Sequence, residues 1–127
     1  MSNIFVYGTL LSGLDNHNYL DNATFIGSGE TSKKYTMFLS YGLIPKVIKS
    51  PKYKIKGEVY LVNDKDLSQI DRLEHKYIRE KVTVKLLNKN IECFMYIYPK
   101  IEKNNKNLPH HNGCFKDYLI TEYGDIR

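Results

Sequence analysis

A glutamate near the middle of the chain combines an acidic side chain with an apolar setting. Apolar residues recur at helical spacing in the segment before it: Leu67, Ile70 and Leu73. Glu74 follows Ile70 by four residues, so a helix would place it on the same face. A carboxylate turned towards a core loses hydration, which raises its pKa towards that of a general acid or base near neutral pH. In the alternative, Glu74 lies just beyond the last turn and faces solvent or pairs with Arg79.

A second candidate is the loop that follows the first apolar segment. Residues 4–7, Ile-Phe-Val-Tyr, are typical of a buried strand, and Gly8 and Gly13 bracket the next residues. Such a loop can expose backbone N–H groups, which hold an anionic oxygen without any charged side chain. We exclude nucleotide phosphates, because Leu14 and Asp15 stand where a phosphate loop needs Lys and then Ser or Thr. An ordinary strand-to-loop turn is the alternative.

The other chemically capable side chains give weaker signals. His110, His111 and Cys114 could contribute metal ligands, but no second Cys or His pair has suitable spacing. A surface loop with two histidines is the simpler interpretation. Cys93 lies in an apolar strand, where a buried thiol is inert, and His17 has no evident orienting partner. We therefore predict no metal site and no cofactor.

The two candidates need a scaffold that brings the end of a helix close to the end of a strand. Besides residues 4–7, alternation and turn residues predict strands at 24–31, 35–40, 44–48, 54–62, 77–87 and 91–98. Asn63 and Asp64 supply a helix N-cap, and the predicted helix runs to Leu73 or Glu74. These elements predict an α+β fold with a mixed sheet of about six or seven strands, strongly curved or closed, and one main helix. We expect a single domain over residues 1–127.

The composition limits the compartment and the partners. Two cysteines are too few to staple a chain of 127 residues, which favours reduced thiols in the cytoplasm. We find no secretory signal and no apolar run of the ~20 residues that a membrane helix needs. The net charge of +5 comes from scattered lysines rather than from a concentrated basic face. We therefore expect a cytoplasmic monomer that binds neither nucleic acid nor membrane.

Together, several segments resemble the gamma-glutamylcyclotransferase-like family, and among its branches the AIG2-like gamma-glutamylamine cyclotransferases. The matching segments keep the family's order and span nearly the whole chain: Phe5-Val6-Tyr7-Gly8-Thr9-Leu10, Gly13 with Asn16-His17, Gly57-Glu58-Val59-Tyr60 with Val62, Ile70-Asp71-Arg72-Leu73-Glu74, Tyr77 with Arg79, and Leu108-Pro109-His110-His111. The Tyr-Gly-Thr-Leu segment with the helix-borne Glu is the specific part, and Leu-Pro-His-His points to the amine branch. Two features depart from that branch: a shorter segment after Glu74 and a loose match over residues 112–115.

The resemblance implies a small curved mixed β-barrel with a site at one mouth. It implies that Glu74 is the catalytic acid/base, and that substrate binding falls to Tyr7, Gly8, Thr9 and Leu10, largely through backbone groups, and to His110 and His111. The implied reaction cyclises a γ-glutamyl amide to 5-oxoproline and a free amine, with no metal or cofactor. In the amine branch the substrate would be γ-glutamyl-ε-lysine.

Two other functions stay open on the sequence. One is a cyclotransferase of the same mechanism that acts on a different γ-glutamyl amide, such as a γ-glutamyl-acylated metabolite. The other is a non-catalytic basic module on the same fold, whose Lys and Arg side chains bind an acidic partner. Such a module would show strongly salt-dependent binding, whereas a panel of γ-glutamyl amides assayed for 5-oxoproline would separate the two enzymes.

Overall fold

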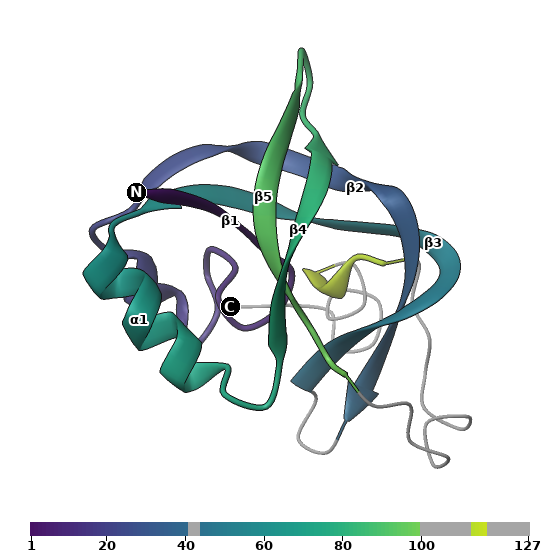
Figure 1. Ribbon diagram of the computed structural model, residues 1–127, viewed down its shortest axis with the longest axis horizontal. Helices are drawn as coiled ribbons and strands as arrows, with labels where there is room; N and C mark the ends of the chain where they lie inside the picture. The colour runs from purple at the N-terminus through teal and green to yellow at the C-terminus, as the bar shows by residue number, and fades with distance from the viewer. Residues whose placement is uncertain (41–43, 100–112, 117–127) are drawn as a thin grey trace.

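The computed structural model describes residues 1–40, 44–99 and 113–116. Its elements, in chain order, are β1 (Ser2–Val6), the 3-10 helix η1 (His17–Leu20), β2 (Thr24–Ser40), β3 (Ile44–Val62), α1 (Asp64–Leu73), β4 (Ile78–Lys85) and β5 (Asn90–Ile97). Figure 1 shows the strands wrapped around one another, with α1 outside them on the side where η1 also lies. The expected α+β class is confirmed.

Among the described residues, five strands close into a mixed barrel in the order β1-β3-β2-β4-β5. Strand β1 pairs antiparallel with β3 and parallel with β5, and all other pairs are antiparallel. Because β1 has a neighbour on both sides, its apolar residues Ile4, Phe5 and Val6 are buried. The first apolar segment is thus a central strand, and the loop that follows it starts inside the sheet rather than at an edge.

The expected number of strands, about six or seven, is too high by one or two. Residues 24–31 and 35–40, predicted as two strands, belong to the single strand β2, and residues 44–48 and 54–62 belong to β3. The pairing of β2 with β3 shifts register between Glu30 and Lys34 and again between Tyr35 and Thr36. The polar residues that resemble turns therefore lie at β-bulges, which bend a strand without ending it. Long, bent strands are what let so few of them close a barrel.

Helix α1 begins and ends close to its predicted bounds. The side chain of Asn63 caps it by accepting a 2.8 Å hydrogen bond from the N–H of Asp66. Leu67 and Ile70 are buried, as the apolar spacing predicts, while most of the opposite face is exposed. After the helix, β4 and β5 form a hairpin that is closed by a 2.8 Å hydrogen bond from Leu86 N–H to the Lys89 carbonyl. Strand β4 lies within its predicted range, and β5 begins and ends one residue before its predicted bounds.

Candidate active site

The loop after β1 is held by hydrogen bonds to its carbonyl groups. The Gly8 carbonyl accepts from the N–H of Leu11 (3.0 Å), and the Thr9 carbonyl accepts from that of Asn16 (2.9 Å). The Asn16 side chain also donates to the Thr9 hydroxyl at 2.8 Å. Gly13 then turns the chain at φ +81°, a conformation that favours glycine. The loop is thus a fixed structure rather than a plain connection.

His17 completes this arrangement, although the sequence indicates no partner for it. Its Nδ1 lies 2.9 Å from the carbonyl oxygen of Leu10, so Nδ1 carries the proton and donates it. The ring also packs at 5.6 Å from the ring of Tyr60. His17 therefore stabilises the loop. The contact joins residues seven positions apart across a turn, and no periodic pattern predicts it.

The N–H groups of Gly8, Thr9 and Leu10 differ from the carbonyl groups of this loop. Within residues 1–40, 44–99 and 113–116, no hydrogen bond engages the N–H of Gly8, Thr9 or Leu10. Leu10 is buried, and backbone donors that are shielded from water normally have a partner. Because the carbonyls are used and the N–H groups are not, this segment can accept an anionic oxygen from a ligand.

Glu74 is the C-cap of α1, and its N–H donates to the carbonyl of Ile70 at 2.9 Å. Its side chain is largely buried, and burial raises its pKa to about 7. It does not pair with Arg79, which instead lies 3.1 Å from the carboxylate of Asp71. No hydrogen bond to the Glu74 carboxylate occurs within the described residues. The carboxyl group is thus able to exchange a proton near neutral pH.

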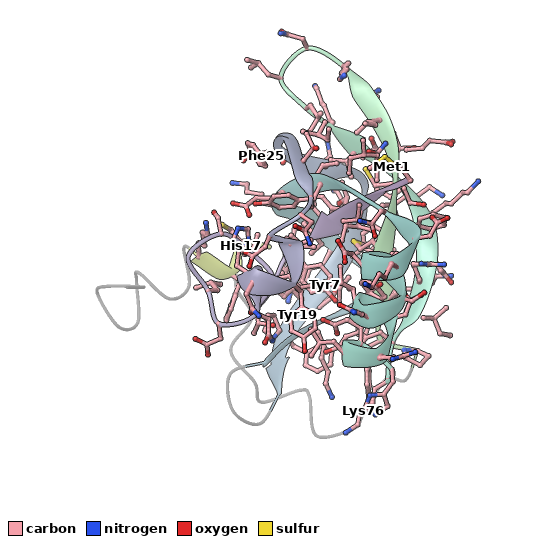
Figure 2. The ribbon with its side chains drawn as sticks, turned by 90° about the vertical axis from the view of Figure 1, so that its left-hand side faces the viewer. Met1, Tyr7, His17, Tyr19, Phe25 and Lys76 are labelled. Carbon is pink, nitrogen blue, oxygen red and sulfur yellow. The ribbon has the colours of Figure 1, made fainter. Side chains whose placement is uncertain are left out.

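Glu74 and the loop line the same small hollow. Its volume is ≈ 30 Å³, and its walls are formed by Phe5, Val6, Tyr7, Gly8, Thr9, Leu10, Pro45, Glu74, Tyr77 and Tyr96. In Figure 2, Tyr7 lies between helix α1 and the 3-10 helix η1, which bears His17 and Tyr19. The structure therefore brings together Glu74 and the four loop residues that the resemblance singled out. The other two residues, His110 and His111, lie outside the described part of the chain.

Three tyrosines line the hollow: Tyr7, Tyr77 and Tyr96. The Tyr7 hydroxyl donates to the carbonyl of Tyr96 at 2.7 Å, and the Tyr96 hydroxyl donates to Asp71 at 2.6 Å. Burial raises the pKa of Tyr7, Tyr77 and Tyr96 well above the usual value, and the Glu74 carboxylate adds to each shift. These phenols therefore stay protonated. The sequence analysis assigns no role to Tyr96, whose place beside Glu74 results from the pairing of β5 with β1 and β4.

A larger groove of ≈ 650 Å³ lies elsewhere, and it lacks such a carboxyl group. Its two acidic residues are Glu30 and Glu58. Burial alone would raise the pKa of Glu58, but hydrogen bonds from Ser12 and the charge of Lys116 outweigh burial and hold it below the usual value. A carboxylate held ionised and fully engaged is a poor proton acceptor. The smaller hollow is the better candidate.

The described residues offer no second reactive centre of the kinds considered in the sequence. Cys93 is buried, and burial raises the pKa of its thiol to about 11, so it is unreactive at neutral pH. In the described part of the chain, no group of three or more His, Cys, Asp or Glu side chains is placed to hold a metal ion. The same residues include no helix with the length and apolarity that crossing a membrane requires.

The residues that line this hollow lie within a match to a known protein family. The family model described as "Gamma-glutamyl cyclotransferase, AIG2-like" matches residues 4–117 of the chain. The chain belongs to this family. The match runs from β1 through the loop and α1 to the residues that follow β5. The resemblance drawn from the sequence motifs is therefore confirmed.

Three curated members of the family are similar to this gamma-glutamyl cyclotransferase-family protein. A protein of Methanocaldococcus jannaschii, provisionally named a gamma-glutamylcyclotransferase, is 41% identical over 124 residues, covering 93% of this chain and 98% of its own. The gamma-glutamylaminecyclotransferase of Homo sapiens is 29% identical over 136 residues and 89% of both chains. The gamma-L-glutamyl-butirosin B gamma-glutamyl cyclotransferase of Niallia circulans is 34% identical over 129 residues, covering 98% of this chain and 75% of its own.

The fold of this family member also matches a solved structure. An AIG2-like protein of Mus musculus superposes with a TM-score of 0.81 and 30% identity, covering 88% of this chain and 86% of that one. The mixed barrel with one helix is thus the architecture of the family.

Proposed function

We propose that this family member cyclises a γ-glutamyl amide to 5-oxoproline and releases the free amine, with Glu74 as the general acid/base. One relationship supports this assignment most directly. The Glu74 carboxyl group, with a pKa of about 7, lines the same hollow as loop N–H groups that have no acceptor in the described structure. A base and an anion-binding segment on one small hollow suit an acyl-transfer reaction.

In the proposed reaction the substrate supplies its own nucleophile. The α-amine attacks the γ-carbonyl carbon, so that a new C–N bond closes the five-membered ring. Glu74 accepts the proton that the amine loses. As the tetrahedral intermediate collapses, the original amide C–N bond breaks, and Glu74 returns the proton to the departing amine. Since both reacting groups share one molecule, the protein mainly has to hold the folded conformer, and the proton transfers contribute roughly 10²–10⁴-fold.

The loop residues Tyr7, Gly8, Thr9 and Leu10 bind the substrate in this proposal. The backbone N–H groups of Gly8, Thr9 and Leu10 hold either the α-carboxylate or the oxyanion that develops on the γ-carbonyl. One lost donor of the oxyanion type costs about 2.7–4 kcal/mol in other enzymes. The hollow of ≈ 30 Å³ has room for about two water molecules. We therefore expect substrate to displace that water and widen the hollow.

The proposed substrate is γ-glutamyl-ε-lysine, with His110 and His111 as further binding residues. The named activity of the human relative supports the amine substrate. A different γ-glutamyl amide is a second candidate, because the Niallia circulans relative is named for a γ-glutamyl-acylated metabolite and is similar over nearly the whole chain. The mechanism needs no metal and is the same for both substrates.

A Glu74→Gln variant tests the mechanism. It keeps the shape of the side chain but cannot take a proton, so we expect a folded protein that releases no 5-oxoproline. Glu80→Gln is the matched control, since Glu80 pairs with Lys49 on the surface, away from the hollow. Turnover of Glu74→Gln at the rate of the unmodified protein would remove Glu74 from the mechanism. A panel of γ-glutamyl amines, γ-glutamyl amino acids and glutathione, assayed for 5-oxoproline, would identify the substrate.

A further inference from the structure

A second buried carboxylate contacts the far end of the loop after β1. Glu58 lies on β3 and is 9% exposed. Its Oε1 accepts a 2.8 Å hydrogen bond from the N–H of Ser12, and its Oε2 accepts one of 2.7 Å from the Ser12 hydroxyl. Ser12 follows Leu10 by two residues. The Glu58 carboxylate therefore binds both the backbone N–H and the side-chain hydroxyl of Ser12 in the loop.

Two further groups satisfy the same carboxylate. The hydroxyl of Tyr60 donates to Oε1 at 3.1 Å, and Nζ of Lys116 lies 3.2 Å from Oε2. Lys116 also donates to the Ser12 hydroxyl at 2.8 Å. Each oxygen of Glu58 thus receives two donors, and charge-assisted bonds of this kind are stronger than neutral ones. Such a fully satisfied buried network fixes geometry.

The elements on both sides of this network are themselves fixed. Glu58 pairs with Val6, the last residue of β1, so it lies beside the point where the loop begins. On the other side, Gly113 accepts a 2.8 Å hydrogen bond from the N–H of Lys56, and Phe115 is buried. Residues 113–116 are therefore docked on β3, which places Lys116 next to Glu58.

We propose that Glu58, held by Lys116, is a positioning residue that sets the orientation of the N–H groups of Gly8, Thr9 and Leu10. The inference rests on the proposed function, since it concerns the segment that binds the substrate there. Asn16 and His17 hold the loop through its carbonyls, and Glu58 holds it through Ser12. Glu58 does not touch the substrate.

Glu58 and Lys116 also line the groove of ≈ 650 Å³, which suggests a ligand site at first sight. Their polar atoms are, however, already engaged with Ser12, Tyr60 and each other. A ligand that used these charges would have to break this network. The network therefore serves the loop rather than a second ligand.

Hydrogen exchange of the loop amides tests the anchor, by which we mean the hold of Glu58 on Ser12. The measurement needs no substrate. In Glu58→Gln the carboxylate charge is lost, so we expect the hydrogen-bonded amides of Leu11 and Ser12 to exchange about 10-fold faster, because the Ser12 bonds weaken. Glu80→Gln is the control and should leave their exchange unchanged. Unchanged exchange in Glu58→Gln would overturn the anchor. If that variant fails to fold, Ser12→Ala makes the same test, because it leaves Glu58 paired with Lys116.

Steady-state kinetics, measured below the unfolding temperature of each variant, then test whether Glu58 positions the N–H groups of the loop. We expect kcat/KM of Glu58→Gln to fall by about 10-fold, while the midpoint of its pH profile stays that of the unmodified protein. Ser12→Ala should show a smaller fall, and Ser12→Thr should restore most of it. Faster exchange with unchanged kcat/KM would overturn the positioning role and leave Glu58 a structural residue. If the unmodified protein releases no 5-oxoproline from any amide tested, the proposed function fails, whereas the anchor is still decided by exchange.

Discussion

The N–H of Glu74 donates a 2.9 Å hydrogen bond to the carbonyl of Ile70. This bond extends the helical pattern by one residue beyond Leu73, the last residue of α1. It keeps Glu74 in line with Ile70, which is fully buried and fixes the inner face of the helix. This main-chain bond fixes the backbone of Glu74 at the helix end, and its side chain lines the hollow. The first two predictions depend on that placement.

The pH dependence of activity should report the ionisation of Glu74. Because the base must be ionised, kcat/KM should rise with pH through a midpoint of about 7, the pKa to which burial raises Glu74. The substrate α-amine adds a second rise at higher pH, because it must also lose a proton before it attacks. The measurement is 5-oxoproline release between about pH 5.5 and about pH 9. A profile that is flat near pH 7, or that falls there, would contradict the assignment.

The same shift predicts how Glu74 affects stability. The folded pKa lies above the unfolded value, so the folded state holds the proton more tightly, and its stability declines as pH rises from 4.5 through about 7. Glu74→Gln removes this decline in stability, because glutamine does not ionise. We therefore expect the variant to be more stable than the unmodified protein at pH ~8, by about 1–3 kcal/mol, with a much smaller difference at pH ~5. Urea unfolding at both pH values would measure it, and an equal difference at both would exclude a buried, protonated Glu74.

Removing the Tyr7 hydroxyl should affect stability more than activity. In Tyr7→Phe the carbonyl of Tyr96 loses a buried donor at 2.7 Å, which should cost about 1–3 kcal/mol. Activity should change little, because the proposal assigns substrate binding at Tyr7 to the backbone. The control is Tyr19→Phe, since the Tyr19 hydroxyl makes no hydrogen bond within the described residues. A large fall in kcat with unchanged unfolding free energy would instead place the Tyr7 hydroxyl in the reaction.

Two glycines of the barrel should respond in opposite ways to alanine. A Cβ at Gly57 would lie 2.1 Å from the carbonyl oxygen of Val6, so β1 and β3 would have to move apart. We expect Gly57→Ala to lose about 1–3 kcal/mol or more of unfolding free energy. A Cβ at Gly27 would meet only Leu86, at 3.5 Å, which is ordinary contact. Gly27→Ala should therefore be neutral or stabilising by a few tenths of a kcal/mol. Equal effects in thermal unfolding would contradict this packing.

The sequence predicted the elements whose signals are local. The apolar run at residues 4–7, the Asn63 cap and the spacing of Leu67 and Ile70 each depend on neighbours within one or two turns, and the structure contains all three features. The prediction of two strands at 24–31 and 35–40 is wrong, because the polar residues between them, which have the composition of a turn, lie at a shift of register within β2.

Contacts between distant segments account for what the sequence did not predict. Glu58 alternates with Val59 along β3, which by itself suggests an outward side chain, yet Ser12, 46 residues away, covers it. The partner of Arg79 is Asp71 rather than Glu74, a contact across the turn that joins α1 to β4.

The sequence by itself thus determined the family, the central strand, the loop and the inward face of the helix, since propensity, periodicity and short motifs act over a few residues. Only the tertiary structure decided that the end of α1 and the loop after β1 share one hollow. It also decided that Asp71, and not Glu74, pairs with Arg79. Closing the barrel sets those distances, and closure depends on pairings between strands far apart in the chain, such as β1 with β5.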